Sequence, residues 1–170
     1  MTAVGAEKLN RMVMNTFDGE HCFTNPYKVL RYVSEGTAER RLPGFPHTIW
    51  ELLNHMNYWQ TLLLQAVTED TVHWPKHEET ESWVDQDILS ATSDWLEEKC
   101  RFYDGLQDAE RLMMQPTALL NPLAAWPGHD GFDALHSAAL HNAYHIGQIV
   151  QLCKAAGEWT PPDSVLMWQR

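Results

Sequence analysis

The sequence has little cysteine, little positive charge and no long apolar run. Its three cysteines, Cys22, Cys100 and Cys153, form no CxxC pair, which argues against a disulfide framework and a thiolate zinc site. We expect them to be small buried residues. Lys and Arg number 12 against 23 Asp and Glu, and the net charge of −11 would repel a phosphate backbone. The sequence therefore predicts no nucleic-acid partner.

Membrane and secretion signals are also missing from the sequence. No stretch approaches the ~20 apolar residues of a membrane span, and the first residues lack the basic and apolar segments of a secretion signal. We expect a cytoplasmic protein with no membrane partner. With 170 residues, 44% of them hydrophobic, the chain can bury a core without disulfides. Residues 1–170 are expected to form a single domain.

Apolar residues recur at helical spacing along the chain, and no segment shows the alternation of a strand. The clearest helix start is Thr48-Ile49-Trp50-Glu51, which matches a capping box. Gly105 and Gly157 are expected to end two of the helices. We expect helices over residues 4–17, 27–33, 48–66, 84–105 and 132–156. For the second, the apolar spacing covers residues 27–33, and the helix is expected to end near Gly36. Four of them are long, so the predicted fold class is all-α, a four-helix bundle.

Two connections separate the long helices. Residues 68–81 are polar and contain Trp74-Pro75, which predicts a loop. Residues 106–131 contain three prolines, each of which opposes a continued helix. A connection of that length is often functional or partly structured, and the sequence leaves both open.

The nine histidines differ in their predicted surroundings. His136 is five residues before His141, about 140° around the helix at ~100° per residue, and should face away from it. Surface or capping roles are expected for the histidines in predicted loops or just before a helix: His21, His47, His73, His77 and His129.

His141 and His145 are four residues apart on a predicted helix, so their side chains share one face and can bind one metal ion. That face also carries Ala138 and Leu152, which turns the pair toward the core. His55 lies between the apolar positions Leu52 and Trp59 of another helix. Three inward histidines could supply three nitrogens and leave a coordination position open, as in catalytic metal sites. Core histidines bonded to other groups would give the same pattern.

Other site chemistries find no support in the sequence. There is no HExxH, no set of bundle glutamates for a di-iron site, no GxSxG and no phosphate-binding glycine loop. Cys153 lies about 120° around the helix from His141 and is not expected to be a ligand or nucleophile.

A broken first helical region is followed by PGFPHTIWELLNHMNYW at residues 43–59, HNAYHIGQI at 141–149 and GEWTPP at 157–162. In this order the segments resemble the DinB/YfiT-like superfamily over most of the chain. The resemblance implies a four-helix bundle that commonly forms a homodimer. It also implies a divalent metal, zinc or nickel, bound by His55, His141 and His145.

Characterised relatives in that superfamily include metal-dependent transferases and isomerases that use bacillithiol, mycothiol or glutathione, while many members have no assigned activity. The leading expectation is therefore a transferase that uses a low-molecular-weight thiol on a small-molecule substrate. Trp59 would supply an apolar wall, and Gln148 or Tyr144 would orient a histidine. The alternatives are a metal-dependent hydrolase, a non-catalytic protein that binds metal or a small ligand, and a bundle with metal-free core histidines.

Overall fold

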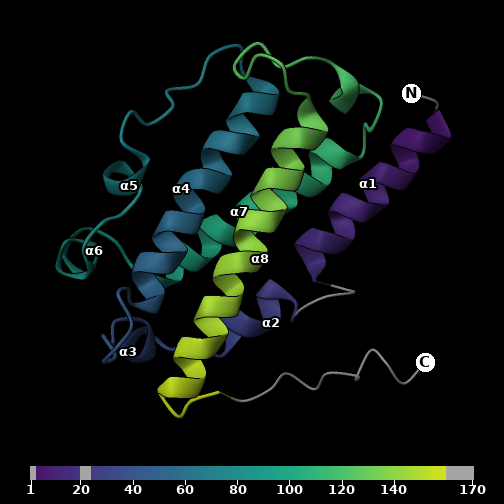
Figure 1. The fold of residues 1–170 in the computed structure, drawn as a ribbon. Helices are drawn as coiled ribbons and strands as arrows, with labels where there is room; N and C mark the ends of the chain where they lie inside the picture. Colours follow the sequence, from purple (N-terminus) through teal and green to yellow (C-terminus); the bar gives the residue numbers. More distant parts are fainter. Residues whose placement is uncertain (1–2, 20–23, 160–170) are drawn as a thin grey trace, which may run out of the picture.

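The computed structural model describes residues 3–19 and 24–159, in which the regular secondary structure is helical and no β-strand occurs. Four of the described helices are long: α1 (Ala3–Asp18), α4 (Ile49–Thr68), α7 (Trp95–Met113) and α8 (Gly131–Ala155). In Figure 1, α8 lies between α4 and α1, and α7 packs behind them against α4. The all-α prediction is confirmed for the described residues.

Short helical segments connect the long ones: α2 (Pro26–Arg31), α3 (Glu35–Ala38), α5 (Glu78–Glu81), α6 (Gln86–Thr92) and the 3-10 turn η1 (Ala118–Leu120). The connection that carries α5 and α6 runs along the α4 side of the molecule (Figure 1). Among residues 3–19 and 24–159, no helix is long and apolar enough to cross a lipid bilayer.

Both helices that carry the candidate histidines start at capping boxes. The Thr48 hydroxyl accepts from the Glu51 amide, and the Glu51 carboxylate accepts from the Thr48 amide, as predicted. Asp130 and Asp133 make the same reciprocal pair at the start of α8, a signal that the sequence analysis missed. Each box satisfies amides that the first turn of a helix leaves unpaired.

The predicted single helix over residues 84–105 is wrong, because it is interrupted at residues 93–94 and does not end at Gly105. The first helix, α6, ends at Thr92. Asp94 then caps the start of α7, where its carboxylate accepts hydrogen bonds from the amides of Leu96 and Glu97. The helix α7 then continues through Gly105 to Met113. A Cβ at Gly105 would lie 2.0 Å from Nε2 of Gln60 on α4, so this glycine permits close helix packing instead of ending a helix.

Smaller predictions also need correction. Gly36 lies inside α3, because Ser34 caps a new turn there. The predicted loop over residues 68–81 ends in the single turn α5, and the connection 106–131 begins with the last eight residues of α7. Cys153 is buried as expected, but Cys100 is exposed on α7. Cys22 and His21 lie outside the described residues.

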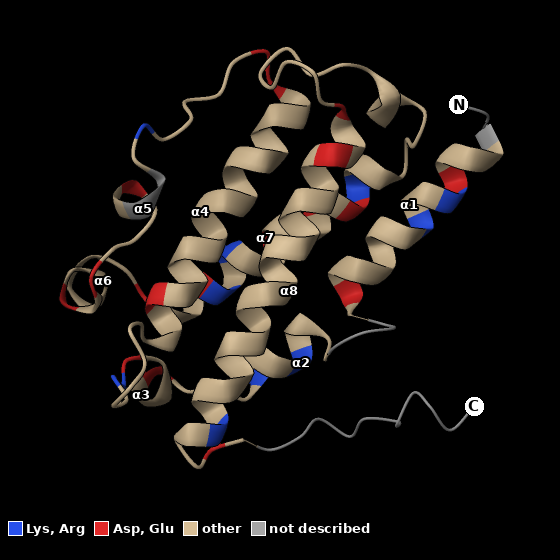
Figure 2. Cartoon of the chain, viewed as in Figure 1, with Lys and Arg blue, Asp and Glu red and all other residues tan. Residues whose placement is uncertain are grey.

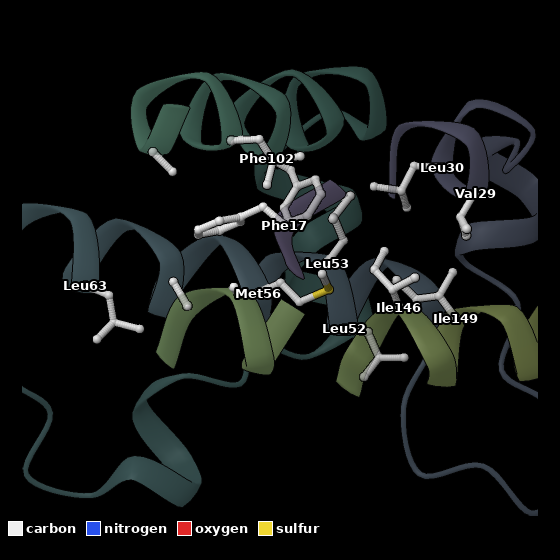
Figure 3. Close-up of a cluster of buried hydrophobic side chains, with 14 of the residues drawn as sticks. Phe17, Val29, Leu30, Leu52, Leu53, Met56, Leu63, Phe102, Ile146 and Ile149 are labelled. Atoms are coloured by element: carbon white, nitrogen blue, oxygen red, sulfur yellow. The ribbon is translucent and has the colours of Figure 1, made fainter. Parts of the chain in front are cut away.

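The core lies where α1, α4, α7 and α8 meet, and α2 closes one end of it. Figure 3 shows Leu53 and Met56 of α4 pointing toward Phe102 of α7 and Ile146 of α8. All four side chains are buried. Charged side chains are sparse where the histidine helices run together: α8 carries Asp133 and Lys154 near its ends and none between, and α4 carries Glu51 alone (Figure 2). The faces of α4 and α8 that pack against each other are therefore uncharged.

Candidate metal centre

The structure brings together His55 from α4 and His141 and His145 from α8. His55 and His145 are buried, with 7% and 6% of their surface exposed, and His141 is half-buried. α4 and α8 make the most extensive helix pairing in the described chain, so the three imidazoles are held by the main packing interface.

The three Nε2 atoms point toward one another. Nε2 of His141 lies 3.1 Å from Nε2 of His55 and 3.2 Å from Nε2 of His145. One nitrogen from each residue lies within 4.8 Å of the others. Nitrogens bound to a tetrahedral zinc ion at ~2.0–2.1 Å are roughly 3.3–3.4 Å apart. The two distances from His141 are therefore close to those between the ligands of one metal ion.

Hydrogen bonds on the far side of two rings set their tautomers. Nδ1 of His55 lies 3.2 Å from the carbonyl oxygen of Ser82, and Nδ1 of His145 lies 2.7 Å from Oε1 of Gln148. Both oxygens can only accept, so each Nδ1 carries the proton and donates. The Nε2 atoms of these two histidines therefore present lone pairs to the centre, as metal-binding histidines with an outer acceptor do.

Burial keeps the three rings neutral. Desolvation, aided by the neighbouring imidazoles, lowers the pKa of His55 to about 4 and that of His141 to about 3. Desolvation also lowers the pKa of His145, although its hydrogen bond to Gln148 works in the opposite direction. At neutral pH all three imidazoles are therefore uncharged, the form that binds metal.

The donor arrangement fits a divalent ion. If His141 carried its proton on Nε2, that proton could make a good hydrogen bond to the Nε2 lone pair of His55 or of His145, but not to both. With that proton on Nδ1, three lone pairs converge, and Nδ1 of His141 is buried without a hydrogen-bond partner in the described chain. A cation at the centre would satisfy all three lone pairs. Three imidazoles suit zinc or nickel, so His55, His141 and His145 could hold such an ion.

Trp83 covers the site from the connection before α6. Its ring stacks on His55 at 3.9 Å between centroids and on His47 at 3.8 Å, so it lies between two imidazoles. The buried carboxylate of Glu51 accepts from the amide of Gln86 at 3.0 Å, which ties this connection to the start of α4. The sequence analysis missed Trp83 and its stack on His47, which is half-buried.

A cavity of about 710 Å³ opens beside the histidines. Trp59 lines it, as expected, and three further tryptophans that sequence reasoning did not select also line it: Trp74, Trp83 and Trp126. Trp74 and Trp126 come from the two long connections. His55 and His141 form part of the wall, so a molecule in this cavity would contact the candidate metal centre.

The remaining predictions have mixed outcomes. Gln148 is the outer partner of His145, while the Tyr144 ring is 66% exposed and touches His145 by its edge. His136 is exposed and lies outside the cluster. His73 and His77 are exposed. The ring of His129 stacks on Trp126 at 4.0 Å and is half-buried, a contact that the sequence analysis did not predict.

Comparison with known proteins gives no match: neither a family model nor a curated protein nor a solved structure matches the chain.

Proposed function

We propose that this chain is a metal-dependent enzyme that transfers a low-molecular-weight thiol to an apolar substrate, and that it is a DinB/YfiT-like four-helix bundle. The observation that carries the proposal is the convergence of three neutral imidazoles at the wall of an apolar cavity. The thiol, the choice of zinc or nickel, the homodimer and the cytoplasmic location come from the sequence resemblance and composition, and are part of the proposal.

The three histidines favour catalysis over a purely structural ion. The described cluster supplies three nitrogens and no fourth His, Cys, Asp or Glu, whereas structural zinc sites use four protein ligands. A bound divalent ion would supply the Lewis acidity that makes a thiol or a water anionic near neutral pH.

The chain's own residues would position the reactants. Ser82 and Gln148 fix two imidazole rings, and Trp83 shields His55 from solvent by stacking. Trp59 and Trp126 provide an apolar wall on which a nonpolar electrophile can lie. With a chlorinated aromatic substrate, the thiolate sulfur forms a bond to the ring carbon, chloride leaves with the carbon–chlorine electron pair, and the thiol proton goes to bulk water.

The test is conjugation of 1-chloro-2,4-dinitrobenzene with bacillithiol, mycothiol or glutathione. We expect one of the thiols to be conjugated in the zinc- or nickel-loaded protein, the reaction to be lost with chelator, and metal to restore it. His141→Ala should abolish turnover, while His136→Ala on the same helix should retain it. Turnover that survives metal removal would refute the mechanism. Ester hydrolysis by the metal-loaded protein without any thiol would favour the hydrolase alternative.

A further inference from the structure

We propose that the tryptophan-lined part of the cavity beside the histidines binds an uncharged aromatic substrate and discriminates against anionic molecules. This inference rests on the proposed function, because it names the substrate class of the same site. It follows from the chemistry of the cavity wall, from the way its indole rings are held, and from the contrast with a second cavity in the same chain.

The wall of the cavity is apolar and lacks charge. Four tryptophans line it with Leu63 and Pro75, and Ser137 and two imidazoles supply the polar atoms. None of the described lining residues is Asp, Glu, Lys or Arg. In the metal-free protein, a carboxylate placed here would lose its hydration with no cation to pair with. The wall therefore favours a ligand without ionised groups.

Three of the four indole rings are held by contacts within the chain. Nε1 of Trp74 donates to the carbonyl oxygen of Ala125 at 2.9 Å, which joins the two long connections. The rings of Trp74 and Trp126 lie 5.7 Å apart at 51°, and His129 stacks on Trp126. Trp83 is held between two imidazoles. Rigid aromatic walls suit a flat ring, because aromatic pairs prefer stacked or edge-to-face contacts.

A second cavity has the opposite character. It measures about 760 Å³, lies between α4 and α7, and is lined by Arg101, Asp104, Asp108 and Arg111 together with Leu112 and other residues. Its two guanidinium groups form ion pairs with Glu98 and Asp108, whereas the lining of the tryptophan cavity contains no charged side chain. The carboxylates of a thiol such as glutathione therefore have no ion-pair partner in the tryptophan cavity, which we assign to the electrophile.

The experiment is isothermal titration calorimetry of the full-length, chelator-treated protein with indole and indole-3-acetate, which share a ring and differ in charge. We expect indole to bind at least about tenfold more tightly than indole-3-acetate. Trp126→Leu, which keeps an apolar side chain, should weaken indole binding about threefold or more. Leu112→Ala in the second cavity should leave it unchanged. Circular dichroism shows whether each variant is folded.

Each outcome decides one question. Equal binding of the two probes, or indole binding that is weakened by Leu112→Ala and not by Trp126→Leu, would overturn the inference without using any variant in the histidine cluster. Zinc binding without selective indole binding would leave the proposed function standing and refute the substrate class. Selective indole binding by a protein that takes up no metal would support the substrate class and refute the proposed function.

Discussion

The side-chain amide of Asn142 donates to Oε1 of Gln60 at 2.7 Å, and this buried bond joins the two helices that carry the histidines. Nε2 of Gln60 donates in turn to the carbonyl oxygen of Phe102 on α7. One glutamine thus connects α4 to both α8 and α7. Because Asn142 follows His141 directly, the bond also sets the register of α8 against His55.

Gly105 provides the space for this glutamine, which leads to a matched pair of predictions. Gly105→Ala would place a Cβ 2.0 Å from Nε2 of Gln60 and displace an amide that makes two buried hydrogen bonds. We expect it to lower the free energy of unfolding by about 1–3 kcal/mol. Gly147→Ala on α8 meets nothing within 4 Å and should raise it by about 0.5–1 kcal/mol. Urea denaturation measures both, and a stabilised Gly105→Ala variant would contradict the packing.

Gln148 is predicted to tune metal affinity without binding metal. Gln148→Leu removes the acceptor from Nδ1 of His145, and loss of such an outer partner typically weakens metal binding about 10–100-fold. Gln151→Leu, an exposed position one turn further on α8, is the control and should leave the affinity unchanged. A chromophoric chelator in competition with the protein measures the dissociation constant. Equal metal affinities in the two variants would contradict the proposed role of Gln148 in metal binding.

The metal-free protein should lose stability on mild acidification. Burial lowers the pKa of His55 to about 4 and that of His141 to about 3, whereas unfolded histidine titrates near ~6.5. Below that pH the unfolded chain binds protons that the folded chain does not, so the free energy of unfolding falls.

Urea denaturation between pH 7.5 and pH 5 in the presence of chelator tests this prediction. The wild type should lose stability over this range, and His141→Gln should lose less. An identical pH dependence in the two proteins would contradict the assigned burial of His141.

Signals confined to a few neighbouring residues could be read from the sequence. The capping box at Thr48 and the common face of His141 and His145 depend on residues three or four apart, where helix geometry alone decides. The placement of His55 opposite that pair followed from the apolar positions around it. The resemblance to the DinB/YfiT-like superfamily selected the same three histidines.

The errors lie where distant contacts decide. Gly105 looks like a helix end unless Gln60 is known to face it. Apolar spacing carried the predicted helix across Ser93, although Ile88 is 54% exposed and Asp94 starts a new helix. The aromatic cavity was not predictable, because Trp74, Trp83 and Trp126 come from connections with no periodic pattern to orient them.

The most direct test of the central claim is the metal content of the untagged protein after loading with zinc or nickel and dialysis, measured by inductively coupled plasma mass spectrometry. The account predicts about one ion per chain. It also predicts strong loss of metal in His55→Ala, His141→Ala and His145→Ala, with retention near the wild-type level in His136→Ala. A wild-type protein without metal, or loss of metal in His136→Ala and not in His141→Ala, would contradict it.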